Sequence, residues 1–480
     1  MKNLPFIHLF KTSQGRYLYD VNRDQIVQVS PFVYDDLKSD PTSCGSTPES
    51  KASILKLRDI GFLKTNRVNE VEHPDTELLP FYLQNKMAQL ILQVTQGCNL
   101  RCEYCAYSGK YANRVHSGKK MSFETAKKSI DYFASHSRDS RKLAVSFYGG
   151  EPLLRYEFIR QCIAYCEKVL SGKEVSFNIT TNGTLLTDEM IDFFASKNLR
   201  IMFSLDGPRN IHDRNRKFAS TGKGSFDVLM NNIKKIQKRY PEYYSKCISY
   251  NAVIDTKDGF ETINKFVMGH EIFHDVQFMA SVVSSRYASE SIEINSGFVE
   301  EWQYEEFKFY LSKLNRFPAE RTSILIKPIF NSMCITCLNK KYENTVELPS
   351  KWHHGGPCKP GVLRLFVSTD GDFYPCERLS EESTVSCIGR IDCGVDLERA
   401  VAVLNVEKIM HKKCMNCWAY RHCTICVGAV DGLDKMDPQL ANQECKEVQS
   451  ATEKAFADYC TLSELGYQFD EEKIARMMYY

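Results

Sequence analysis

The chain has 480 residues, a length that usually accommodates about three domains. Its 62 Lys and Arg balance 60 Asp and Glu to a net charge of +2, so no overall field favours nucleic acid or an acidic membrane as a partner. The 19 cysteines fall largely in metal-ligand spacings, without a hydrophobic signal segment or an apolar run near the roughly twenty residues that span a bilayer, so we expect a cytoplasmic protein.

Residues 1–85 contain no metal-ligand pattern. Their composition predicts short strands over 6–10, 16–22 and 25–30, separated by turns. Apolar residues at helical spacing then predict helices over 32–38 and 50–61. The sequence therefore predicts a small domain of strands followed by helices.

Residues 88–295 alternate apolar strands with helical stretches, as expected of βα units around a parallel sheet. In β/α barrels the chemistry lies at the carboxyl ends of the strands. The predicted strands cover residues 89–95, 143–148, 175–181, 200–205, 247–254 and 275–281.

Three cysteines follow the first of these strands directly: Cys98, Cys102 and Cys105. Iron-sulfur clusters are normally closed by four thiolates, and the next cysteine is as distant as Cys162. The spacing therefore predicts a cluster with one open iron. A zinc site is the alternative, but zinc sites favour paired Cys-x2-Cys ligands.

The CxxxCxxC pattern with Tyr104 before its last cysteine resembles the signature of the radical S-adenosylmethionine (SAM) superfamily. The resemblance implies an α/β fold, a partial (β/α)6 TIM-like barrel over 88–295 and a [4Fe-4S] cluster on the three cysteines. It also implies SAM on the open iron and an enzyme that cleaves SAM reductively to a 5′-deoxyadenosyl radical.

Further motifs follow the predicted strands, beginning with Gly149-Gly150-Glu151-Pro152 after the second. In the resembled family this tetrapeptide receives the SAM amino group. Positions after strands three and four correspond to ribose and carboxylate contacts, and an HDxxR pattern ends at Arg216, for which a surface ion pair is the alternative. The implied SAM-binding residues are Tyr104, Gly149, Gly150, Glu151, Pro152, Asn182, Ser204, Asp206 and Arg216.

Residues 296–350 form a bridging region that opens with a predicted helix over 296–314, and residues 351–480 are dense in cysteine. Alternating residues around Asp370-Gly371-Asp372 predict a hairpin that could bring Cys376 near Cys358. Farther on, Cys414-x2-Cys417-x5-Cys423-x2-Cys426 precedes Cys445. Four of these thiols could close a zinc ribbon, but seven cysteines exceed one zinc site.

This cysteine order resembles the SPASM domain of peptide-modifying radical SAM proteins, which implies two auxiliary [4Fe-4S] clusters and three clusters in all. By family order, Cys414, Cys417, Cys423 and Cys445 hold the distal cluster, and Cys358, Cys376 and Cys426 hold the nearer one. Two departures stand out: only two residues separate Cys423 from Cys426, and Trp352 occupies a usual cysteine position. We therefore expect an open iron on the nearer cluster, with Cys334, Cys337, Cys387, Cys393, His353 or His354 as alternative ligands.

The strand-then-helix pattern of residues 1–85 resembles the winged-helix RiPP recognition element, a PqqD-like fold that binds the leader of a ribosomally made peptide. Strand addition would supply the affinity through main-chain hydrogen bonds. A simple cap over the barrel is the alternative.

Together these resemblances imply a maturase of a cysteine-containing precursor peptide, forming sactipeptide- or ranthipeptide-type thioethers with electrons from a reductant such as flavodoxin or ferredoxin. One alternative is formylglycine formation as in anaerobic sulfatase maturases, with Glu377 after Cys376 as general base. Another is a non-catalytic protein that binds SAM and clusters.

Overall fold

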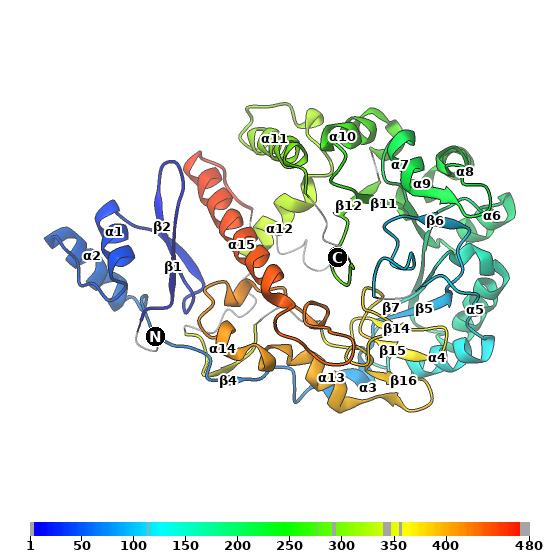
Figure 1. Cartoon of the computed structure of the whole chain (residues 1–480), viewed down its shortest axis with the longest axis horizontal. Helices are drawn as coiled ribbons and strands as arrows, with labels where there is room; N and C mark the ends of the chain where they lie inside the picture. Colours follow the sequence, from blue (N-terminus) through cyan, green and yellow to red (C-terminus); the bar gives the residue numbers. More distant parts are fainter. Residues whose placement is uncertain are drawn as a thin grey trace.

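The computed structural model describes residues 4–112, 115–274, 276–289, 294–338, 347–354 and 358–470. A six-stranded parallel sheet with outer helices forms the right of Figure 1, and a small amino-terminal sheet with two helices projects at the left. Within these described residues no helix is both long and apolar enough to cross a membrane.

The amino-terminal sheet is antiparallel in the order β1-β2-β3, so β1 and β3 are its edges. Both helices that follow it begin with a side-chain cap, from Ser30 for α1 and Thr47 for α2, each with a proline in the first turn. These elements confirm the predicted strands and helices to within two residues. They are β1 (Ile7–Lys11), β2 (Arg16–Asp20), β3 (Gln25–Gln28), α1 (Pro31–Ser39) and α2 (Pro48–Asp59).

The central sheet contains all six predicted strands, each parallel to the next in chain order. They are β5 (Gln89–Thr95), β7 (Lys142–Gly149), β8 (Glu174–Thr181), β9 (Arg200–Ser204), β11 (Ile248–Ile254) and β12 (Gln277–Val282). The intervening helices are α4 (Phe123–Ser135), α5 (Tyr156–Val169), α6 (Asp188–Ser196), α7 (Arg209–Asn215), α8 (Phe226–Arg239), α9 (Pro241–Cys247) and α10 (Phe260–Gly269).

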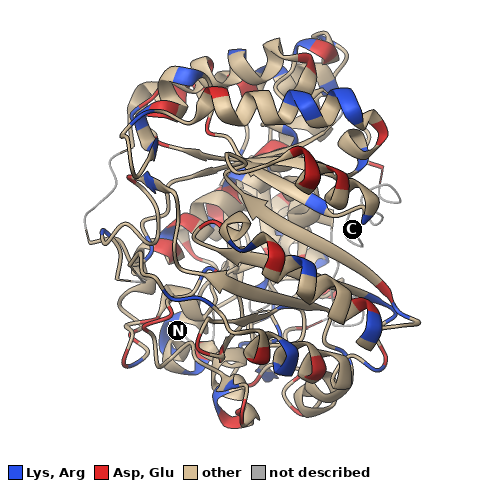
Figure 2. Cartoon of the chain, turned by 90° about the vertical axis from the view of Figure 1, so that its right-hand side faces the viewer, with Lys and Arg blue, Asp and Glu red and all other residues tan. Residues whose placement is uncertain are grey.

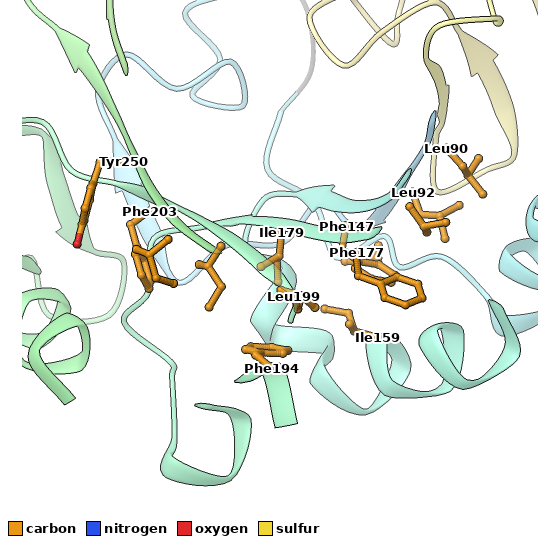
Figure 3. Close-up of a cluster of buried hydrophobic side chains, with 14 of the residues drawn as sticks. Leu90, Leu92, Phe147, Ile159, Phe177, Ile179, Phe194, Leu199, Phe203 and Tyr250 are labelled. Atoms are coloured by element: carbon orange, nitrogen blue, oxygen red, sulfur yellow. The ribbon is translucent and has the colours of Figure 1, made fainter. Parts of the chain in front are cut away.

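The two faces of this sheet differ in polarity because successive strand residues point to opposite sides. Apolar side chains such as Leu92, Phe177 and Phe203 are buried against the outer helices (Figure 3). The inner face instead carries polar residues such as Ser146 and Asn178. The sheet therefore packs on the outer helices through its apolar face and presents polar groups to the inside of the half-barrel.

The carboxyl-terminal region extends this sheet. The predicted hairpin forms as β14 (Leu365–Val367) and β15 (Asp372–Tyr374), and β14 pairs in parallel with β5. Two short strands, β16 (Gly389–Arg390) and β17 (Gly394–Val395), complete a ten-stranded sheet. The hairpin was predicted, whereas its place on the edge of the barrel sheet was not.

The longest helix, α15 (Ala441–Glu464), packs along α12 (Lys327–Leu338) and contacts β1, so it lies between the barrel side and the amino-terminal sheet (Figure 1). His8 of β1 stacks on Trp418 with ring centroids 3.6 Å apart. The remaining elements here include α11 (Ser296–Lys313), which matches the predicted helix, α13 (Leu397–Leu404) and α14 (His411–Cys414). Shorter pieces are α3 (Leu79–Asn85) and the pair β4 (Glu70–Val71) and β13 (Lys351–Trp352).

Candidate active site

The three cysteines after β5 lie together at the carboxyl end of the sheet. Cys102 ends β6 (Leu100–Cys102), which pairs with β10 (Arg216–Phe218). Burial, the charge of Glu151 and the nearby thiols of Cys102 and Cys105 together raise the pKa of Cys98 to about 12. Burial likewise raises the pKa of Cys102 to about 11. Binding to iron would displace these protons, so the donor set suits a metal cluster better than a free nucleophile.

The spacing of these sulfurs also bears on the zinc alternative. One zinc ion holds its thiolates about 2.3 Å from the metal, hence about 3.8 Å from one another. Within the described part of the chain, only His353, His354 and Glu407 place three ligand atoms within 4.8 Å of one another. The cysteine groups are therefore more open than a single zinc requires, as a larger cluster would demand.

The glycines of the Gly149-Gly150-Glu151-Pro152 turn bring it against the cysteine loop. A Cβ on Gly149, whose φ is +141°, would lie 2.1 Å from the Thr95 carbonyl oxygen. A Cβ on Gly150 would lie 2.2 Å from the Gly97 oxygen. Side chains at either position would push the two loops apart, so both glycines serve close approach.

Glu151 is 1% exposed and its carboxylate faces the end of β8. It accepts hydrogen bonds from Thr181 Oγ1 at 2.6 Å, Asn182 N at 2.8 Å and Leu153 N at 2.9 Å. Burial raises its pKa in spite of these donors. Glu151 thus holds two strand ends in register, while Pro152 is buried at the start of the next helical turn. Asn182 also donates to Asn99 in the cysteine loop at 2.9 Å.

Asp206 is fully buried after β9 and organises three partners. Its Oδ2 accepts from Arg216 Nε at 2.8 Å and from the Tyr104 hydroxyl, and its Oδ1 accepts from Val253 N at 3.1 Å. The Arg216 guanidinium lies 5.5 Å from the Tyr104 ring centroid. This arrangement makes Asp206 the residue that positions Tyr104 and Arg216 beside Cys102.

His212 of the HDxxR pattern is 1% exposed and links the same residues through the backbone. Its Nδ1 accepts from Asp206 N at 3.4 Å, and its Nε2 lies 3.0 Å from Ser225 Oγ, which donates to the Arg216 carbonyl at 2.8 Å. Burial lowers the pKa of His212 to about 4, so the ring is neutral near pH 7.

A cavity of about 860 Å³ fills the inside of the half-barrel. Tyr104 from the cysteine loop borders it, and so does Glu377 from the carboxyl-terminal region. Glu377 Oε1 lies 3.3 Å from Arg364 Nη1. Glu377 thus lines the cavity. Ser204, half-buried at the end of β9, is not among the residues that line it.

Gln93, which belongs to none of the sequence motifs, joins three parts of the site. Its Nε2 lies 2.8 Å from the Tyr107 hydroxyl and 2.6 Å from Glu381 Oε1, and its Oε1 accepts from Thr369 N at 2.9 Å. It is fully buried, on the inner face of β5. A glutamine within an apolar strand was the available indication.

The four cysteines predicted to share the distal cluster lie close together. Burial raises the pKa of Cys414, and the thiols of Cys423, Cys417 and Cys445 each raise it further. Burial also raises the pKa of Cys423 to about 12. The end of α14, the segment after it and the start of α15 therefore bring these four thiols near one another, and their sharing of a cluster stays a prediction.

The predicted nearer set is only partly assembled. Burial raises the pKa of Cys376 to about 11, and Cys426 is among the charges that add to this shift. Arg286, in the loop after β12, places Nη1 3.9 Å from Cys426 Sγ and binds Glu444 with Nη2 at 2.9 Å. Cys358 is exposed, and no contact among the described residues joins its thiol to Cys376 or Cys426.

The alternative ligands occupy different places. Cys337 donates to the Ala455 carbonyl at 3.5 Å, ten residues and so about 15 Å along α15 from Cys445. Cys334 lies one turn earlier on α12, so neither thiol lies at the start of α15 beside Cys445. Cys387 packs by Tyr374, two residues before Cys376, while Cys393 is exposed.

His353 and His354 are buried beside Glu407. His353 Nδ1 bonds the His354 carbonyl at 2.8 Å, and its Nε2 accepts from Glu407 N at 3.1 Å. Both ring nitrogens of His353 are thus engaged by the backbone. This geometry suits a packed polar cluster rather than a metal site.

Comparison with known proteins agrees with the geometry. Residues 92–267, which contain the first five strands of the half-barrel apart from the start of β5, match the model of the radical SAM superfamily. The chain is 22% identical to the radical SAM cyclopropyl synthase TigE of Paramaledivibacter caminithermalis over 77% of this chain and 75% of that protein.

A second relative, the serine-type anaerobic sulfatase-maturating enzyme of Bacteroides thetaiotaomicron, is 36% identical over 160 residues. That match covers 32% of this chain and only 38% of the relative. The fold is similar to the structure of native anSMEcpe with bound AdoMet and Cp18Cys peptide, with a TM-score of 0.58 at 19% identity, over 79% of this chain and 98% of the other.

Proposed function

We propose that the protein is a radical SAM maturase of a ribosomally made, cysteine-containing peptide, and that it forms thioethers between cysteine sulfur and an acceptor carbon. The observation that carries this proposal is that one cavity is bordered by a sequence neighbour of Cys105 and by a sequence neighbour of Cys376. Tyr104 of the cysteine loop lines one part, and Glu377, next to Cys376, lines another.

In this proposal Cys98, Cys102 and Cys105 hold a [4Fe-4S] cluster, and the Asp206-centred group orients Arg216 toward SAM. Cluster and SAM together would supply a 5′-deoxyadenosyl radical for hydrogen abstraction. The inner face presents polar groups such as Ser146 and Asn178 among apolar ones such as Ile91 and Met279, a mixture that would suit a peptide. A relative's structure with a bound peptide supports a peptide substrate.

Recognition of the peptide leader is assigned to the amino-terminal domain. In its three-stranded sheet β1 lies against α15, while β3 is the other edge. An extended leader could pair with β3 through main-chain hydrogen bonds. The packing of this domain against α15 would keep a bound leader attached to the catalytic region.

The carboxyl-terminal cysteines would hold two auxiliary clusters, the distal one on Cys414, Cys417, Cys423 and Cys445. Cys376 and Cys426, with Cys358, would hold the nearer one and leave an iron for the substrate sulfur. Iron analysis of anaerobically reconstituted protein is expected to give about twelve irons per chain. Replacing Cys414 should remove about four, whereas replacing exposed Cys44 should remove none.

Formylglycine formation is the second candidate, and Glu377 favours it because a carboxylate lies beside Cys376 in the cavity. Its Oε1 lies 3.3 Å from Arg364 Nη1, which fixes where the carboxylate lies in the cavity. Glu377→Gln should abolish this reaction, whereas thioether formation by a radical route should retain part of its rate.

Coexpression with each small cysteine-rich peptide encoded beside the gene, followed by mass spectrometry, tests the main proposal. A loss of two hydrogens per ring, mapped by fragmentation to a cysteine and an acceptor, is the expected result. Cys98→Ala should leave the peptide unchanged, and Cys44→Ala should process it normally. Absence of 5′-deoxyadenosine with reduced protein and SAM would overturn both enzymatic candidates.

A further inference from the structure

The two-stranded ribbon that carries Cys102 has two chemically different faces. Register places Arg216 opposite Cys102, and Lys217 opposite Arg101. Cys102 and Arg216 face the site, where Arg216 contacts Asp206. Because neighbouring strand residues point to opposite sides, Arg101 and Lys217 share the outer face.

Two cations directly opposite each other destabilise an antiparallel pair. No described carboxylate lies within 4.0 Å of a side-chain nitrogen of Arg101 or Lys217. The acid next to Cys102, Glu103, acts instead on the charge of Arg214. The described residues therefore supply no carboxylate partner for this pair of charges.

Elsewhere on the barrel, several cations have an acidic neighbour. Lys197 lies 2.6 Å from Glu167, Arg239 lies 2.5 Å from Asp192 and Lys265 lies 2.9 Å from Glu261. The view of Figure 2 shows Lys and Arg interspersed with Asp and Glu over the helices of this side. The ribbon differs in that its two cations stand directly opposite each other across one antiparallel pair.

Arg101 is also tied to the cysteine loop itself. Its Nη1 donates to the carbonyl oxygens of Cys98 and Leu100, both at 2.8 Å. The outer cations and the inner thiol of Cys102 are thus separated by a single layer of strand. A protein docked on the outer face would come close to the group that the three cysteines hold.

We propose that this outer face, centred on Arg101 and Lys217, is the docking site of a small acidic protein that carries one electron. The donor would lose one electron to the group held by Cys98, Cys102 and Cys105, and no covalent bond would form or break. Opposite charge would speed encounter and fix orientation. This inference rests on the proposed radical SAM function.

The test compares two reductants on the full-length reconstituted enzyme. With flavodoxin, its reductase and NADPH, Lys217→Glu should raise the flavodoxin concentration for half-maximal 5′-deoxyadenosine formation about tenfold and flatten its salt dependence. Dithionite, which needs no docking, should support the wild-type rate. Lys234→Glu on the exposed surface of α8 is the matched control and should behave as wild type with both reductants.

Direct titration of oxidised flavodoxin provides a readout that does not depend on turnover. Binding should weaken in Lys217→Glu and not in Lys234→Glu. Unchanged flavodoxin binding, or an equal loss of rate with dithionite, would overturn the docking site. Tighter binding of a short RNA than of flavodoxin at the same salt would overturn it as well. If wild type fails to cleave SAM with dithionite, the proposed function fails, while the binding titration still decides the docking site.

Discussion

At the scale of single residues, Gly150 controls how closely the Gly149-Gly150-Glu151-Pro152 turn meets the cysteine loop. Gly150→Ala would place a methyl group against the Gly97 oxygen, 2.2 Å from the ideal Cβ. We expect SAM affinity to fall at least about tenfold, or roughly 1.4 kcal/mol, because the turn must retreat. Equilibrium binding of SAM to the reconstituted protein measures this.

Gly118→Ala is the control, since a Cβ there meets nothing within 4 Å. It lies in the same loop region and should bind SAM as wild type does. Equal affinities for both variants would contradict the role of close approach at Gly150.

His212 makes stability depend on pH. Its pKa is lowered by burial from 6.5 to about 4, so the unfolded chain binds the proton first as pH falls. The contribution of neutral His212 to the free energy of unfolding is fully present above pH 6.5 and is lost as the pH falls toward 4. Between pH 7 and pH 5 we expect a loss of about 2 kcal/mol in the free energy of unfolding.

Urea titrations at the two pH values measure that loss. His212→Gln keeps hydrogen-bonding groups but has no titrating ring. Its change in the free energy of unfolding between pH 7 and pH 5 should therefore be about 2 kcal/mol smaller than that of the wild type. The same pH dependence in both proteins would show that other groups cause it.

At the scale of elements, the edge of β3 offers a sharp test of leader binding. Val29 N donates to Arg16 O at 2.9 Å, so alternation along the ladder directs the Gln28 N–H away from β2. Gln28→Pro would remove an outward donor and leave the β2–β3 ladder intact. We expect leader affinity to fall about fivefold to tenfold for the loss of one hydrogen bond.

Fluorescence anisotropy with a labelled synthetic leader measures this change. Gln28→Ala removes the side chain and keeps the N–H, so it should bind as wild type does. If the alanine variant weakens binding as much as the proline variant, the side chain and not the strand edge recognises the leader.

The elements show which parts of the fold the sequence could predict. The six barrel strands have long apolar runs between turns, so local pattern located them to within about two residues. The ribbon of residues 100–102 and 216–218 has only three residues in each strand and lacks such a pattern. The two strands are more than 110 residues apart in the sequence. Their pairing depends on tertiary contacts such as the ion pair of Arg216 with Asp206.

The site was predictable in the same uneven way. Cysteine spacing pointed to the thiols that lie together, because short loops hold them. Gln93 and Asp206 owe their roles to partners on other elements, such as Glu381 and Val253, which no local pattern contains. Cys334 and Cys337 have a ligand-like spacing, but α12 places them against α15 instead.

At the scale of the whole molecule, Arg286 joins the barrel to the carboxyl-terminal region. It binds Glu444 through Nε and Nη2 at 3.2 and 2.9 Å. Arg286→Met should lower the free energy of unfolding by about 1 kcal/mol, since the pair is only partly buried. Denaturant midpoints of both single variants and the double variant Arg286→Met with Glu444→Gln measure the coupling.

The two single losses added together should exceed the loss of unfolding free energy in the double variant by at least about 0.5 kcal/mol, which is the coupling between the two side chains. Strict additivity would mean that the two side chains do not stabilise each other. In that case the contact of Arg286 with Cys426 would be its main role in joining the two regions.

The parallel pairing of β14 with β5 has a consequence for biosynthesis. β5 emerges from the ribosome early, but its edge partner follows about 270 residues later. At 5 to 20 residues per second, that edge waits roughly 15 to 55 seconds without its neighbour. An unpaired strand edge is a template for aggregation. Until Leu365–Val367 are synthesised, the nascent chain therefore needs a temporary partner for this edge. That partner is a chaperone or another segment of the chain that β14 later displaces.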